Sequence, residues 1–188
     1  MAYLRALASR ESDMKPGLAM PGSSNAARGI LQVVGVVRED YNRRFGTNYT
    51  PDDLFDPDIN VKIAANLINQ IAAGYEKHPD RNLKTNWDNP EFVKLLTAGW
   101  NAGFSEAAGV GRVARYLEER KLSVTHDAVI DNAAAAGAVS YLQRDDRRMW
   151  HRSVADLYYA QPDWKPTNYI LLGAIAVALA YGAYQFVK

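Results

Sequence analysis

Apolar residues recur at four-residue intervals in two stretches of the chain. The first stretch holds Val33, Val37, Tyr41 and Phe45, and the second holds Ile59, Ile63, Leu67, Ile71 and Tyr75. This spacing places the apolar side chains on one face of an α-helix, so each stretch is predicted to form a helix with one buried stripe. No segment alternates apolar and polar residues with the period of two that a half-buried strand shows. We therefore expect an all-α fold, or an α fold with a minimal β element.

Capping residues followed by proline indicate where helices begin. The three pairs are Thr50-Pro51, Asp56-Pro57 and Asn89-Pro90. In each pair the side-chain oxygen can accept a hydrogen bond from a free helical amide, and proline fits the first helical position. Gly46 and Gly103 are predicted helix ends, because glycine tolerates the left-handed conformation there.

The C-terminal segment has a different pattern. Residues from Tyr169 to Val187 carry no charge, and Gln185 is the one amide side chain among them. A helix of about 20 apolar residues spans the hydrocarbon core of a bilayer, so a transmembrane helix is predicted over residues 167–188. Aromatic rings near both ends agree with this interpretation. The alternative is a fully buried helix in the core of an all-α protein.

Small residues recur within this apolar segment, at Ala174, Ala178 and Gly182. Such a stripe permits close packing against another helix, although a Gly/Ala-rich span also explains it. The preceding residues 147–166 are basic and aromatic, which is typical of a juxtamembrane connector. The predicted organisation is a helical domain over residues 1–146, this connector, and the transmembrane helix.

Composition and charge narrow the classes of function. The chain has 188 residues, 48% of them hydrophobic, which is enough for a folded core. Its 22 basic and 21 acidic side chains leave a net charge of +1, so nucleic acid is not an expected partner. Cysteine is absent, and the three histidines lack metal-ligand spacing. We expect no metal ion and no cofactor.

Glu11 is the first candidate for acid chemistry. It ends an apolar helical pattern formed by Tyr3, Leu4 and Leu7, shortly before Pro16. A carboxyl group at such an edge can lose part of its water, which raises its pKa and lets it donate a proton near neutrality. A solvated surface charge has the same local pattern.

Further segments change the meaning of Glu11. After Glu11-Ser12 come Gly29-Ile30-Leu31-Gln32, Leu54-Phe55-Asp56-Pro57-Asp58-Ile59-Asn60 and Gly99-Trp100-Asn101-Ala102-Gly103. In this order the four segments resemble the motifs of the soluble lytic transglycosylase family, relatives of goose-type lysozyme that cleave bacterial peptidoglycan. The resemblance covers residues 3–145 and implies a lysozyme-like fold for that region.

The resemblance also implies roles for individual residues. Glu11, beside Ser12, would be the single catalytic acid/base, and Gln32 and Asn101 would form amide hydrogen bonds with the saccharide. Trp100 stands where the family has tyrosine, so it lacks the hydroxyl but keeps an aromatic face for a sugar ring, or else belongs to the core.

Two assignments have competitors. The family has a late tyrosine that donates a hydrogen bond to the catalytic carboxyl, and Tyr141 is the best match, with Tyr116 as the alternative. Asp56 and Asp58 would fit a second catalytic carboxylate. A cap before proline explains Asp56 better.

The resemblance implies cleavage of the β-1,4 bond between N-acetylmuramic acid and N-acetylglucosamine, with a 1,6-anhydromuramyl product and peptidoglycan as the partner. A hydrolytic muramidase is one alternative. A second is an inactive relative that binds glycan or serves as a membrane-anchored structural protein of a virion.

The location follows from the two ends of the chain. The N-terminal residues lack the pattern of a signal peptide, and the basic cluster lies on the catalytic side of the predicted span. The positive-inside rule would keep such an enzyme away from a cell wall. We therefore expect a bacteriophage virion protein, held in an internal membrane or ejected with the genome to open the host wall. A bacterial envelope protein is the alternative.

Overall fold

The computed structural model describes residues 2–22 and 25–161. Seven α-helices are found in these ranges: α1 (Ala2–Ser12), α2 (Gly35–Phe45), α3 (Pro57–Tyr75), α4 (Pro90–Ala102), α5 (Val110–Glu119), α6 (His126–Asn132) and α7 (Asp145–Tyr159). Three short 3-10 helices accompany them: η1 (Asp52–Phe55), η2 (Arg81–Leu83) and η3 (Ser140–Gln143). The all-α prediction is confirmed for this part of the chain.

The minimal β element that the sequence left open consists of two isolated bridges. Arg28 pairs with Ala19 and with Val33 in the loop between α1 and α2. No longer strand forms in the described ranges, which agrees with the lack of period-two alternation.

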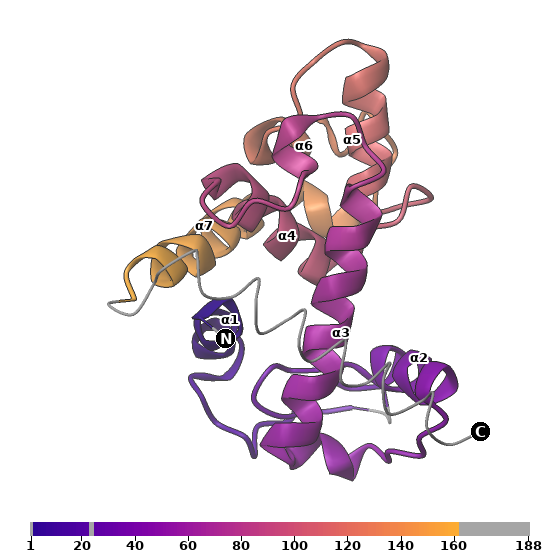
Figure 1. Ribbon diagram of the computed structural model, residues 1–188, viewed down its shortest axis with the longest axis vertical. Helices are drawn as coiled ribbons and strands as arrows, with labels where there is room; N and C mark the ends of the chain where they lie inside the picture. Colours follow the sequence, from indigo (N-terminus) through magenta and orange to yellow (C-terminus); the bar gives the residue numbers. More distant parts are fainter. Residues whose placement is uncertain (1, 23–24, 162–188) are drawn as a thin grey trace, which may run out of the picture.

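Helix α3 runs through the length of the molecule and connects its two ends (Figure 1). Helix α2 lies beside one end of α3, and α5 and α6 lie towards the other end. Helices α1, α4 and α7 lie between these ends, and α7 packs against both α1 and α4. The hydrophobic core is continuous through these contacts, since side chains of all seven helices contribute to one buried cluster.

The caps of α3 and α4 follow the sequence prediction. The Asp56 carboxylate accepts hydrogen bonds from the amides of Asp58 (2.8 Å) and Ile59, and Asn89 accepts one from Glu91 (3.0 Å). Asp56 is thus the N-cap of α3 rather than a free carboxylate.

The other predicted helix boundaries give a mixed result. Gly46 and Gly103 end α2 and α4 with positive φ angles, as predicted. Thr50-Pro51 leads only into the short 3-10 helix η1, because the chain must turn again to begin α3. Of the predicted apolar stripe, Tyr41 on α2 is buried, Val33 is buried in the loop just before the helix, and Phe45 is 53% exposed at the last turn.

The predicted boundary after residue 146 does not separate a domain from a connector. It falls at the start of α7, where His151, Val154 and Tyr158 are buried in the shared core. These residues lie on one face of the helix together with the largely buried Arg147, whereas Arg148 and Arg152 are more exposed. As far as residue 161, the expected connector is an integral helix of the folded domain.

No helix in the described ranges is long and apolar enough to cross a membrane. The span predicted at residues 167–188, with its stripe of Ala174, Ala178 and Gly182, lies outside the described residues.

Candidate active site

Glu11 lies in the last turn of α1, where its carboxyl group has lost most of its contact with water. Burial raises the pKa of Glu11 from 4.5 to about 7. A hydrogen bond from Trp100 and the positive charge of Arg147 oppose this rise. The resulting value leaves both protonation states accessible near neutrality, which is the requirement for a group that first gives and then takes a proton.

Trp100 provides the direct contact to this carboxyl group. Its indole Nε1–H donates a hydrogen bond to Glu11 Oε1 over 2.7 Å. The sequence suggested that Trp100 offers an aromatic face to a sugar, whereas the structure shows its N–H holding the carboxyl group. Indole is a donor only, so it can orient Glu11 but cannot accept a proton from it.

Helix α4 brings Trp100 close to Glu11 because Gly99 permits tight packing against α3. A Cβ atom at position 99 would lie 2.4 Å from the Tyr75 hydroxyl oxygen and 2.8 Å from Ile71. Only glycine fits that space without a shift of α3. The same hydroxyl donates a hydrogen bond to the carbonyl of Leu95 over 2.8 Å, which fixes the distance between the two helices.

Ser12 connects the end of α1 to the loop that follows. Its hydroxyl donates a hydrogen bond to the carbonyl of Ile30 over 2.7 Å and accepts one from the amide of Lys15. The side chain is 4% exposed. Ser12 therefore lies next to Glu11, as the sequence implied, but its hydroxyl is bonded to the backbone and not directed towards solvent.

The loop around Gln32 is held by Asn60 of α3, which belongs to the third of the four motifs. The Asn60 carboxamide accepts a hydrogen bond from the amide of Leu31 and donates to the carbonyls of Arg28 and Leu54, each over 2.9 Å. Gly29 has a positive φ of 78°, and a Cβ atom there would lie 2.0 Å from the Leu54 carbonyl oxygen. These contacts explain why glycine and asparagine occur at these positions.

Gln32 donates hydrogen bonds from its amide nitrogen to the carbonyls of Leu18 (3.0 Å) and Gly29 (2.8 Å). The residue is nearly buried and has a left-handed φ of 47°. Both amide protons are thus used within the loop. Only the carbonyl oxygen of Gln32 is left to accept a hydrogen bond from a ligand.

Asn101 follows Trp100 at the end of α4 and is half-buried. Its Oδ1 lies 3.1 Å from Nε2 of His151, and Nδ1 of His151 lies 2.9 Å from Nε2 of His126. Both histidines are almost fully buried. Burial lowers the pKa of His126 to about 4 and that of His151 to about 3, so both rings are neutral at ordinary pH.

Tyr141 lies near the site, but its hydroxyl is held by an arginine. Arg147 donates a hydrogen bond from Nη1 to the Tyr141 hydroxyl over 2.5 Å, and its guanidinium lies 4.6 Å from the ring centre. Arg147 also lowers the pKa of Glu11 through its charge, and Trp100 makes the direct contact expected for the late tyrosine. Tyr116, the competitor, lies on α5 under the guanidinium of Arg120.

Arg147, His126 and His151 were not predicted as site residues from the sequence. Arg147 and His151 belong to the segment that was predicted to be a basic connector, and His126 had no predicted role. Arg147 and His151 reach the site through the packing of α7 on α1 and α4, and His126 reaches it through the contacts of α6 with α4 and α7. The apolar spacing of Val154 and Tyr158 on the same helix was the one signal that this segment belongs to the core.

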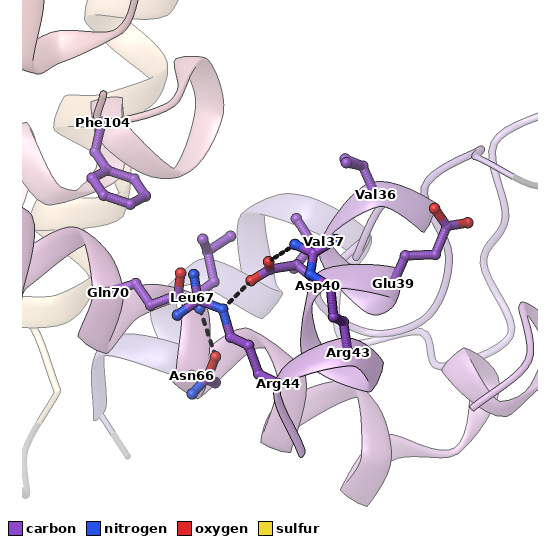
Figure 2. A pocket seen from close by; sticks show the side chains of 10 residues that line it. All are labelled: Val36, Val37, Glu39, Asp40, Arg43, Arg44, Asn66, Leu67, Gln70 and Phe104. Atoms are coloured by element: carbon purple, nitrogen blue, oxygen red, sulfur yellow. Dashed lines mark hydrogen bonds and ion pairs between the residues drawn. The ribbon is translucent and has the colours of Figure 1, made fainter. Parts of the chain in front are cut away.

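A pocket of about 330 Å³ lies between α2 and α3, with Phe104 facing it from the segment after α4 (Figure 2). Several of its polar groups bind one another: Arg43 and Arg44 both pair with Asp40, and Gln70 donates a hydrogen bond to Asn66. The pocket thus combines a polar lining with one aromatic ring. Within the described ranges, no group of three histidine or acidic side chains is placed to hold a metal ion.

Residues 1–124 match the family model of the transglycosylase SLT domain. The fold resembles the crystal structure of the 70 kDa soluble lytic transglycosylase Slt70 from Escherichia coli, with a TM-score of 0.58 and 19% sequence identity. This similarity covers 88% of the chain but 22% of Slt70, so the chain spans about a fifth of that protein. At this identity the structural match establishes the fold alone. No curated protein sequence matches the chain.

The first prediction concerns the hydrogen bond from Trp100. This bond stabilises the charged form of Glu11, so the substitution Trp100→Phe is expected to raise the pKa of Glu11 further above 7. Carbon-13 NMR titration of the Glu11 carboxyl would measure the change. Trp87→Phe is the matched control, because Trp87 packs against Tyr3 and Phe92. An unchanged or lower pKa in Trp100→Phe would contradict the assignment.

The second prediction concerns the effect of Glu11 on stability. Its folded-state pKa lies above its ordinary value of 4.5, so its stabilising contribution is complete below about pH 4.5 and is lost as the pH rises through about 7. Glu11→Gln removes this loss. Urea unfolding at about pH 8 should show the variant to be more stable than the unsubstituted chain by roughly 2–3 kcal/mol, and the gain should shrink towards about pH 5.

Glu76→Gln is the control of opposite sign. Hydrogen bonds from Thr85 lower the pKa of Glu76, so the native carboxylate contributes stability at high pH that the variant loses. If Glu11→Gln showed no gain that grows with pH, the raised pKa of Glu11 would be refuted.

Proposed function

The chain belongs to the transglycosylase SLT domain family, and on this basis we propose that it is a peptidoglycan lytic transglycosylase with Glu11 as its single acid/base. The observation that carries the proposal is the buried Glu11 carboxyl, with a pKa of about 7 and a hydrogen bond from Trp100. Ser12 and Trp100 tie it to two further motifs of the family, the Gln32 loop and the end of α4.

In the first step Glu11 protonates the glycosidic oxygen between N-acetylmuramic acid and N-acetylglucosamine. Its Oε1 accepts the indole N–H of Trp100, which leaves Oε2 to carry the proton. As the bond between the muramyl C1 and this oxygen breaks, an oxocarbenium-like transition state develops. N-acetylglucosamine leaves with the proton from Glu11 on its freed oxygen.

In the second step the Glu11 carboxylate takes the proton of the muramyl C6 hydroxyl, and the C6 oxygen bonds to C1. This closes the 1,6-anhydro ring and returns Glu11 to its protonated form. Because the nucleophile belongs to the same sugar, the reaction benefits from a high effective molarity and uses no water. The Trp100 hydrogen bond stabilises the carboxylate between the two steps.

The charges around Glu11 support this single-residue mechanism. Hydrolytic glycosidases use a pair of carboxyl groups that flank the bond. Among the described residues, the charged side chain that most affects the pKa of Glu11 is the cation of Arg147 and not a second carboxylate. Asp56, the candidate for that second role, is occupied as the cap of α3.

The glycan would be held by the amide groups of Asn101 and Gln32. Asn101 and the carbonyl oxygen of Gln32 retain hydrogen-bonding capacity for a ligand. Phe104, which lines the pocket between α2 and α3, follows Asn101 closely in the chain. We expect this pocket to bind a neighbouring sugar of the glycan strand. An aromatic ring with a polar lining suits a saccharide.

The third prediction is the product of the reaction. The full chain, incubated with purified sacculi, should release muropeptides with 1,6-anhydro ends, which mass spectrometry identifies. Glu11→Gln keeps the size of the side chain but cannot donate the proton, so it should abolish release. Loss of this group should cost at least about 10² to 10⁴ in rate. Glu76→Gln, a change at an exposed carboxylate that accepts a hydrogen bond from the amide of Thr85, should retain activity.

Other outcomes identify the alternatives. Reducing ends would show a hydrolytic muramidase. Sacculus binding without release would show an inactive glycan-binding or structural protein. Anhydro products from Glu11→Gln would remove Glu11 from the mechanism.

We also propose that the protein is carried by a bacteriophage particle, anchored through residues 167–188, and opens the host wall locally during genome entry. The support is the uncharged C-terminal stretch from Tyr169 to Val187 in a chain of a wall-cleaving family. As a fourth prediction, mass spectrometry should find the chain in purified virus particles. Its absence there, with recovery in a bacterial membrane fraction, would favour the envelope protein instead.

A further inference from the structure

A row of three polar side chains leads from the interior to the end of α4. Nε2 of His126 lies 2.9 Å from Nδ1 of His151, and Nε2 of His151 lies 3.1 Å from Oδ1 of Asn101. The two rings meet edge to face and are 1% and 0% exposed, whereas Asn101 is half-buried. Two fully buried histidines in contact are costly, and the acid/base mechanism uses neither.

The atoms in this row allow one assignment of protons. Oδ1 of Asn101 can only accept, so Nε2 of His151 must carry a proton. In a neutral ring Nδ1 of His151 is then bare and accepts the proton of Nε2 of His126. Nδ1 of His126 is bare in turn. This last conclusion agrees with the structure, where that nitrogen is buried and has no hydrogen-bond partner.

The surroundings of His126 favour the same direction. Asp127 lies 3.5 Å from Nδ1 of His126, but its oxygens already accept hydrogen bonds from Arg148 and Arg152. The amide of His126 donates to Glu91 over 2.7 Å, which fixes the ring at the start of α6. The charge of Asp127 is thus balanced by two arginines, and its carboxylate does not require a hydrogen bond from Nδ1 of His126.

The charges that face the second ring also keep it neutral. Arg147 lies on the same helix and opposes protonation of His151, as His126 does, and Asp146 acts weakly in the other direction. Lys94 and Arg152 likewise oppose protonation of His126, against Asp127 and Glu91. The row therefore keeps one direction of hydrogen bonding throughout the pH range in which Glu11 changes its charge.

We propose that His126 and His151 are positioning residues that fix the carboxamide of Asn101 with its oxygen inward and its NH₂ group towards the glycan. Asn101 then presents donors only, so the substrate group it recognises is an acceptor. Among the groups on this polymer, the carbonyl oxygen of an N-acetyl substituent fits this requirement. A deacetylated amino sugar carries an ammonium group there, which can only donate.

The recognition of an N-acetyl group by Asn101 rests on the proposed function. The placement of protons on His126 and His151 does not. Nitrogen-15 NMR of the unsubstituted full chain at neutral pH reports which ring nitrogen is protonated. The fifth prediction is that His151 and His126 are both neutral and both protonated at Nε2. Protonation at Nδ1 in either ring would reverse the row, turn the carbonyl oxygen of Asn101 outward, and overturn the proposal even if the protein is an active transglycosylase.

The role towards the ligand is tested by binding, because binding does not require turnover. In the Glu11→Gln background, calorimetry with an N-acetylglucosamine oligomer should show about tenfold weaker binding after Asn101→Ala or His151→Leu. His151→Gln should restore most of the affinity, since its amide can donate to Oδ1 of Asn101 from a similar place. In the double variant, His151→Leu should have no further effect on top of Asn101→Ala.

Two comparisons separate positioning from general damage to the fold. His78→Leu removes another buried histidine, which pairs with Glu118 on α5, and should lower thermal stability without changing affinity. The Glu11→Gln protein should bind the deacetylated oligomer more weakly than the acetylated one. Adding Asn101→Ala should abolish that difference in affinity. Additive losses in the double variant, failure of His151→Gln to restore binding, or equal affinity for the two oligomers would refute the proposal.

Discussion

The site depends on the removal of water from the carboxyl group of Glu11. An exposed glutamate stays ionised at neutral pH and cannot donate a proton. Here the end of α1 is enclosed by α4 and α7, and the loss of solvent raises the pKa to about 7. The indole of Trp100 and the cation of Arg147 moderate that rise, so the group is neither permanently charged nor permanently neutral.

This enclosure requires three helices that are far apart in the chain. Helix α1 supplies the carboxyl group, α4 supplies Trp100 and Asn101, and α7 supplies Arg147 and His151. Gly99 sets how closely α4 approaches α3, and the Tyr3 hydroxyl contacts Thr97 across α1 and α4 at 3.0 Å. The helix contacts that build the core are therefore the same contacts that exclude water from Glu11 and set its pKa.

Three carboxamides of the family motifs show how burial separates structural from functional roles. Asn60 is fully buried and uses its oxygen and nitrogen on backbone groups, so it fixes the loop. Gln32 uses its two donors on the same loop and keeps only an acceptor. Asn101 uses its oxygen inside and keeps its donors. Each carboxamide has one carbonyl acceptor and one NH₂ donor group. Its partners within the protein determine which of these groups is left to bind a ligand.

Local pattern in the sequence was sufficient for the helices and for the motifs. Apolar spacing located α2 and α3, the caps Asp56 and Asn89 marked helix starts, and four ordered segments indicated the family. Each of these signals acts within a few residues of the chain, because helical periodicity and capping are local effects. The sequence placed Gly29 and Asn60 in the motifs, but it did not show that they contact each other and the Leu54 carbonyl.

The partners of the site side chains came from tertiary packing. No local pattern pairs Trp100 with Glu11 or joins His151 to Asn101, because each contact links residues far apart in the chain and depends on how the helices dock. The basic residues of α7 resembled a membrane-proximal connector. The sequence shows that a helix carries charged residues, but it does not show whether the rest of that helix packs against protein. Proton affinity and hydrogen-bond direction are set by surroundings in three dimensions, whereas residue order is sufficient to specify which helices form.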